Sequence, residues 1–68
     1  MSIELKKFCA DLILTDAIMD MAAEKGITWQ EARSRIINSR AYMDLYDFET
    51  GLWANGPDYF RDYYSKIA

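Results

Sequence analysis

Apolar residues recur at helical spacing along most of the chain, and this pattern predicts a small all-α bundle of three or four helices. The first stretch, from Ile3 to Lys25, contains no Gly or Pro. Ser2 is a good N-cap residue, and Gly26 is well suited to end a helix. We therefore expect one long helix over this range.

Two apolar strips are expected on the first helix. At about 100° per residue, one strip comprises Leu5, Phe8, Leu12, Met19 and Ala23. The second lies roughly opposite, comprises Ala10, Leu14, Ala17 and Met21, and is bordered by Ile18. A surface helix normally has one apolar stripe. Two strips therefore predict either a central helix sandwiched in the bundle or a helix with one strip covered by another chain. In the second case Leu14 and Met21 are the candidate contacts of a homo-oligomer.

The middle of the chain predicts two shorter helices. Thr28 and Glu31 form a capping box before a helix from Trp29 to about Ile37. Its inward side would carry Trp29, Ala32 and Ile36. Asn38-Ser39 predicts a break, with Ser39 capping a third helix from Arg40 to about Glu49. One continuous bent helix over both ranges is the alternative.

An aromatic-rich loop is expected before the last helix. Thr50-Gly51 should end the third helix, and residues 52–54 should be extended before a turn at Asn55-Gly56. Pro57 suits the first position of the final helix. That helix has an amphipathic pattern made by Phe60, Tyr63, Tyr64 and Ile67. Residues 1–68 are expected to form a single helical domain.

The composition narrows the chemistry. Cys9 is the only cysteine and there is no histidine, so an internal disulfide is excluded and a structural zinc site lacks its usual ligands. We expect no metal and no cofactor. A core of this size supplies roughly 3–5 kcal/mol of net stability. The chain is therefore expected to rely on tight aromatic packing, on a partner or on self-association.

The charge and the length of the apolar runs bear on partners and location. A net charge of −3 makes nucleic acid an unlikely main ligand, because phosphate binding needs concentrated Lys and Arg. No signal-peptide pattern follows the N-terminal lysines, and no apolar run is long enough to span a bilayer. The sequence predicts a cytoplasmic protein without a membrane interaction.

Catalysis is not expected. Cys9 has no histidine to act as its base. The acidic residues Asp44, Asp47, Glu49 and Asp58 have a spacing that matches no calcium loop. A small helix-turn-helix-like DNA-binding regulator is an alternative function, because a capped helix follows Gly26. The next helix, however, would carry Asp44 and Asp47 where phosphates approach.

Aromatic residues give the main functional hint. Eight of the ten lie between Tyr42 and Tyr64, and Tyr, Trp and Arg dominate binding energy at protein interfaces. We predict a non-enzymatic protein–protein interaction module whose partner-binding patch draws on Arg40, Tyr42, Tyr46, Trp53, Tyr59 and Tyr63.

The second half of the chain resembles a family of short, uncharacterised bacterial helical proteins. The matching residues are Thr28-x-x-Glu31-Ala32, Tyr42-Met43-Asp44-Leu45-Tyr46-Asp47 and Gly56-Pro57-Asp58-Tyr59. Genes of that family often lie beside ADP-ribosyltransferase-like genes. The resemblance therefore implies an antitoxin-like or accessory partner of a neighbouring enzyme, and it implies no catalytic residues.

Overall fold

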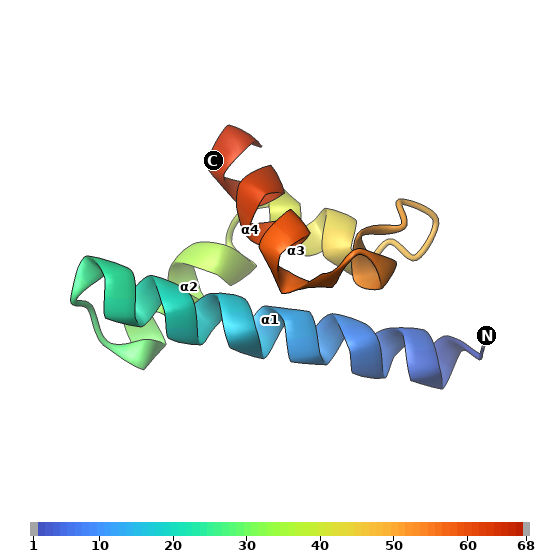
Figure 1. The fold of residues 1–68 in the computed structure, drawn as a ribbon, viewed down its shortest axis with the longest axis horizontal. Coiled ribbons are helices and arrows are strands. Elements are labelled where there is room, and N and C mark those ends of the chain that lie inside the picture. Colours follow the sequence, from blue (N-terminus) through green and yellow to red (C-terminus); the bar gives the residue numbers. More distant parts are fainter. Residues whose placement is uncertain (1, 68) are drawn as a thin grey trace.

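The computed structural model describes residues 2–67, and over this range the chain is all-α, without a strand (Figure 1). The elements in order are α1 (Ile3–Lys25), α2 (Trp29–Ile37), α3 (Arg40–Leu45), the 3-10 helix η1 (Leu52–Ala54) and α4 (Gly56–Ile67). The prediction of a small all-α bundle is confirmed, and α2 and α3 are separate helices.

The caps read from the sequence set the helix ends. Ser2, Thr28 and Ser39 each precede a helix, and each hydroxyl accepts a backbone N–H three residues on, at 3.1–3.4 Å. Such bonds satisfy donors that the first turn of a helix leaves free. Gly26 ends α1 with a φ of 64°, in the left-handed region that glycine adopts without steric cost.

The long helix α1 runs along one side of the molecule, and α3 and α4 lie together on the other side (Figure 1). The elements that pack directly on α1 are α2, η1 and α4, while α3 packs on those three. The buried residues of α1 are Ala10, Ile13, Ala17, Ile18 and Met21. Its small alanines allow neighbouring helices to approach closely.

All other elements thus cover one face of α1. The prediction that α1 is sandwiched in the bundle is wrong, because nothing in the described chain covers its opposite face. The rest of the core comes from Ala32, Ile36, Ala41, Leu45, Leu52 and Phe60. Leu14 packs against this core from a half-buried position.

Two helix boundaries differ from expectation for local reasons. The helix α3 ends at Leu45 rather than Glu49, because the Thr50 hydroxyl donates to the carbonyls of Asp44 and Asp47 at 2.7 and 2.9 Å. These bonds offer the backbone a turn in place of another helical turn. The helix α4 begins at Gly56, one residue before Pro57, and Gly56 has a left-handed φ of 83°.

Residues 52–54 form a 3-10 turn rather than an extended segment. The left-handed φ of 78° at Gly51 reverses the chain, and the N–H of Ala54 then donates to the Gly51 carbonyl at 3.1 Å. This turn buries Leu52 and brings Trp53 against the core.

Trp29 also differs from expectation, since 47% of its surface is exposed. It is the first residue of α2. Because Cα–Cβ bonds in a helix tilt toward its N-terminus, a side chain at this position points back over the preceding loop.

Candidate protein-interaction surface

The face of α1 opposite the core carries a row of exposed apolar side chains. Leu5, Phe8, Leu12 and Met19 are 45%, 58%, 56% and 56% exposed. We call these four residues the outer strip. Ala23 continues it toward the end of the helix and is also exposed. The strip is the first of the two predicted from the sequence.

The outer strip has the spacing of a helix–helix seam. Its residues follow each other at intervals of three, four and seven, with Thr15 in the remaining heptad position. This 3-4 pattern is the one that lets two helices interlock their side chains. From Leu5 to Met19 the strip extends about 21 Å at 1.5 Å per residue.

The second strip does not provide a surface for another chain. Met21 is 9% exposed and belongs to the core, and Leu14 packs against it. The prediction that Met21 contacts a second copy is therefore wrong, and Leu14 is turned toward the chain's own core. Ala10 and Ala17 on the same strip are buried as well.

The predicted aromatic patch is divided among separate places. Tyr42 and Tyr46 pack against each other with ring centroids 5.1 Å apart, and Phe48 follows at 6.3 Å from Tyr46. The Tyr46 hydroxyl donates to the Asp11 carboxylate on α1. Burial, and then this hydrogen bond, raise the pKa of Tyr46. This group anchors α3 to α1.

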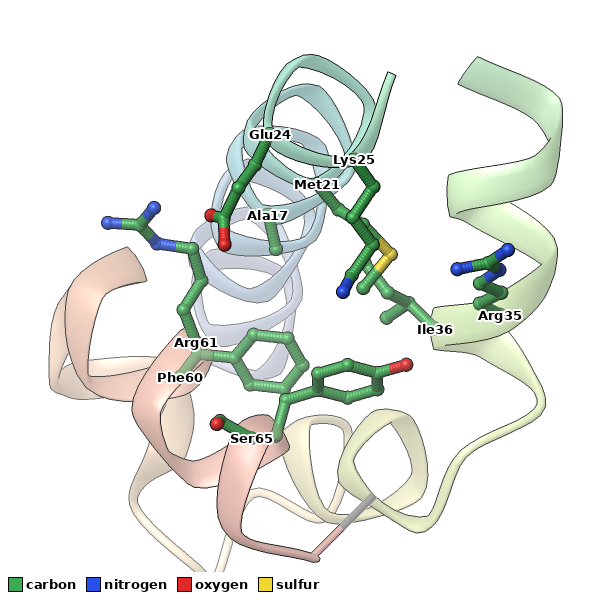
Figure 2. Close-up of a pocket in the computed structure, with 10 residues that line it drawn as sticks. Ala17, Met21, Glu24, Lys25, Arg35, Ile36, Phe60, Arg61 and Ser65 are labelled. Carbon is green, nitrogen blue, oxygen red and sulfur yellow. The ribbon is translucent and has the colours of Figure 1, made fainter. Parts of the chain in front are cut away.

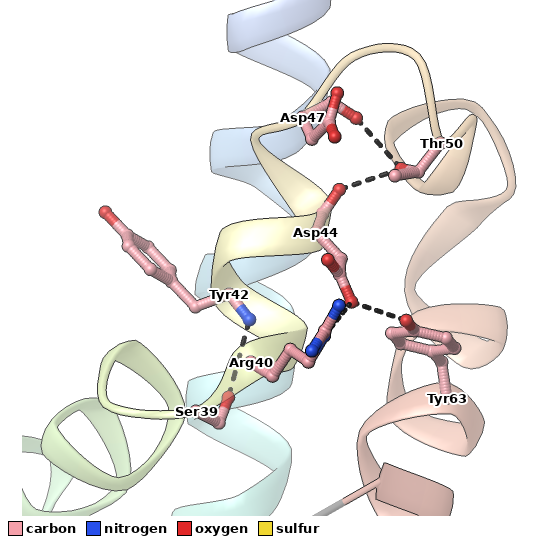
Figure 3. Close-up of polar contacts among 7 residues, drawn as sticks. All are labelled: Ser39, Arg40, Tyr42, Asp44, Asp47, Thr50 and Tyr63. Carbon is pink, nitrogen blue, oxygen red and sulfur yellow. Dashed lines mark hydrogen bonds and ion pairs between the residues drawn. The ribbon is translucent and has the colours of Figure 1, made fainter.

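Tyr63 and Arg40 meet at a different site, on the Asp44 carboxylate (Figure 3). The Tyr63 hydroxyl donates to Asp44, and Arg40 Nε lies 3.8 Å from it. In Figure 3, Tyr42 points away from this cluster. Tyr59, one turn before Tyr63 on α4, is 53% exposed. Of the six predicted patch residues, only Arg40 and Tyr59 are exposed.

Trp53 lies beside the N-terminal half of α1. Its indole N–H donates to the Phe48 carbonyl at 2.9 Å, and Lys6 Nζ lies 5.5 Å from the ring centroid. Next to it is an open depression of about 440 Å³ lined by Cys9, Leu12, Ile13, Trp53, Ala54, Gly56 and Pro57. Leu12 thus belongs both to the outer strip and to the depression.

A second cavity of about 360 Å³ opens between α1, α2 and α4 (Figure 2). Its apolar wall includes Met21, Ile36 and Phe60, and the charges around it are those of Glu24, Lys25, Arg35 and Arg61. The Arg61 guanidinium is paired with Asp20 at 2.9 Å and Asp58 at 2.6 Å. The charges of opposite sign around this cavity mark no single ligand.

Three of the four carboxylates that the sequence singled out have structural partners, and Glu49 is the exception. Asp47 accepts the backbone N–H of Glu49 at 3.2 Å, Asp58 pairs with Arg61, and Asp44 holds Tyr63. Within residues 2–67 no group of three or more His, Cys, Asp or Glu side chains is arranged to hold a metal ion. No helix in the same range is long and apolar enough to cross a membrane.

No family model matches the chain, and no curated protein or solved structure is significantly similar to it.

The outer strip was visible in the sequence, but not as the exposed one. Its Leu and Phe are larger than the alanines of the second strip, so size alone favours burying them. One signal points the other way, because the alanines of the second strip permit close helix packing.

Proposed function

We propose that the protein is a non-enzymatic interaction module that binds another protein through the outer strip. One observation carries this proposal: four large apolar side chains stand in a helical seam interrupted only by Thr15, on the face of α1 directly opposite the core. Contiguous exposed apolar side chains on a protein surface often mark a protein–protein interaction site. The exposed aromatic Phe8 is a natural anchor.

The biological setting belongs to the same proposal. We infer an antitoxin-like or accessory role toward a neighbouring enzyme, exercised in the cytoplasm. What supports the role is the resemblance carried by the Thr28, Tyr42–Asp47 and Gly56–Tyr59 segments. A partner that binds only the folded state stabilises it, and a protein with so small a core would gain from this.

No specific observation favours the DNA-binding alternative. The helix α3 has six residues, and Asp44 on it is committed to Tyr63 and Arg40. Arg33 and Arg35 are exposed on α2, but they are the only two basic residues of this nine-residue helix, which also carries Glu31.

Photo-crosslinking in cells that make the protein tests the proposal. A benzophenone amino acid replaces Leu12 on the outer strip, and a control variant carries it at Arg33, which is exposed on α2. We expect a discrete adduct of higher mass from the Leu12 variant and none from the Arg33 variant. Mass spectrometry of the adduct then identifies the bound protein. The same adducts from both positions, or no discrete adduct from Leu12, would remove the outer strip as the binding surface.

A further inference from the structure

We propose that the outer strip binds an amphipathic α-helix of another protein, and that this helix carries Lys or Arg along both sides of its apolar seam. The inference rests on the proposed function and adds the chemistry of the partner. Three features of the surface support it.

The first feature is the shape of the strip. It lies on a single uninterrupted helix of 23 residues and follows the 3-4 spacing of interlocking helices. A β-strand would match this repeat poorly, because its side chains alternate with a period of two. An α-helix of about 14 residues would span the distance from Leu5 to Met19.

The second feature is the distribution of charge around α1. The charged side chains nearest the strip are all carboxylates, at roughly 45–95° from its centre line: Glu4, Asp11, Asp16 and Asp20. The lysines of α1 lie farther round the helix, at roughly 125–135°: Lys6, Lys7 and Lys25. A helix that docks on the strip therefore meets Glu4 and Asp11 on one side and Asp16 on the other, while Asp20 is already paired with Arg61.

Two of these carboxylates, Asp16 and Asp20, lie one turn apart and differ in their surroundings. Asp20 is paired with Arg61 at 2.9 Å. Asp16, half-buried one turn earlier, has a pKa raised by burial and then by the negative charge of Asp20. A cation brought by a partner would relieve this crowding.

The third feature is the depression beside Leu12. Its lining is mostly apolar, with Trp53, Ile13 and Pro57, so an apolar side chain placed there would lose contact with water. Because Leu12 forms part of its rim, a helix on the outer strip can place one side chain in the depression and the rest along the seam.

The charges also separate this partner from two others. A second copy of the chain would bring its own carboxylates against those of the first, and like charges across an interface are unfavourable. Membrane-surface helices carry Lys and Arg toward anionic headgroups, whereas the flanks of this strip are acidic. A basic-flanked helix is the occupant that the charge pattern favours.

Three synthetic peptides of about 18 residues test the inference with the full-length protein. All three are fluorescently labelled. The first has a Leu seam with Lys flanks, the second keeps the seam with Glu flanks, and the third is a scrambled form of the first. Anisotropy titrations at low salt should give a Kd for the first peptide at least about tenfold below those of the other two. The preference over the Glu-flanked peptide should shrink as salt is raised, because salt screens surface charge.

Variants assign the binding to the proposed surface. Leu12→Ser should abolish binding of the first peptide while the far-UV circular dichroism spectrum stays unchanged. The double variant Glu4→Gln/Asp16→Asn should reduce the preference for Lys flanks by at least about threefold. The matched control Glu49→Gln, which removes an exposed carboxylate from the loop after α3, should leave it intact.

The contrary outcomes separate the two proposals. Equal binding of the Lys- and Glu-flanked peptides, lost in Leu12→Ser, would overturn the basic partner and keep the strip as a binding surface. A dimer seen by light scattering that Leu12→Ser dissociates would do the same in favour of a second copy. Binding that Leu12→Ser does not affect, or no binding of any peptide, would overturn the inference. The crosslinking experiment would still decide the proposed function.

Discussion

The two sides of α1 are similar in apolar content, but one side is buried and the other is exposed. On one side Ala10, Ile13, Ala17 and Ile18 are at most 4% exposed and hold the short helices together. On the other side the outer strip consists of exposed Leu, Phe and Met side chains. Because isoleucine and leucine have the same size, side-chain size did not decide which side became the core. Close approach of α2, η1 and α4 did, and alanine allows it.

The adjacent residues Ile18 and Met19 test this difference between the two sides of α1 most directly. Ile18 is 2% exposed and Met19 is 56% exposed, so Ile18→Asp and Met19→Asp place the same charge on opposite sides. Ile18→Asp should unfold the protein, because an unpaired buried carboxylate exceeds the roughly 3–5 kcal/mol available. Met19→Asp should change stability by less than about 1 kcal/mol. Circular dichroism at 222 nm with thermal melts measures both. A Met19→Asp variant that also unfolds would mean that the outer strip is needed for folding.

The two tryptophans differ in burial, and their substitutions should therefore differ in effect. Trp53 is half-buried and donates a hydrogen bond to the Phe48 carbonyl, whereas Trp29 is 47% exposed. Trp53→Ala should lower the free energy of unfolding by about 2 kcal/mol, less than the roughly 3–5 kcal/mol of a fully buried ring. Trp29→Ala should lower it by less than about 1 kcal/mol. Urea denaturation of both variants gives the two values. Equal losses in the free energy of unfolding would contradict the difference in burial between the two rings.

Tyr46 tests the link between α3 and the edge of the outer strip. Tyr46→Phe removes its hydrogen bond to Asp11 and should lower the free energy of unfolding by about 1 kcal/mol. The effect should also depend on pH. The folded-state pKa of Tyr46 is raised above the value in the unfolded chain, so its contribution is complete below about pH 10 and is lost as pH rises toward the folded-state value.

Denaturation curves between pH 8 and 11 check this dependence. The parent protein should lose stability at the alkaline end more steeply than Tyr46→Phe does. Parallel curves would show that Tyr46 does not titrate differently in the folded protein.

Asp16 gives the smallest effect and concerns the acidic flank. Its pKa is raised in the folded state, so ionisation above that pKa opposes folding, and the cost disappears as pH falls through it. Asp16→Asn should therefore raise stability at pH 7 by no more than about 0.5 kcal/mol. At a pH below the unfolded value of 3.8 the gain should vanish. Thermal melts at both pH values provide the measurement, and a variant less stable at pH 7 would contradict the raised pKa.

The helix ends could be predicted because they depend on a few neighbouring residues. Ser2, Thr28, Ser39 and Gly26 satisfy the first and last backbone groups of their helices wherever those helices pack. The end of α3 could not be predicted in the same way. It depends on a competition that Thr50 wins by bonding back to Asp44 and Asp47, six and three residues away.

The interaction surface was harder to predict than the fold. Periodicity gives the angle between the two strips of α1, but not which one the other helices cover. The aromatic residues posed a similar problem. Tyr46 and Tyr63 have carboxylate partners on other helices, Asp11 and Asp44, and those pairings depend on tertiary structure. Arg40 and Tyr59 remain exposed, but the division of the aromatic set between separate sites was not visible from their spacing.

The placement of the outer strip opposite the core has a consequence for how this protein can change. Leu5, Phe8, Leu12 and Met19 can be randomised together without disturbing the buried side chains that hold the helices in place. A library at these four positions should therefore consist mostly of folded members with different binding preferences. Natural drift at the same positions would let descendants of one scaffold acquire new recognition while keeping one architecture.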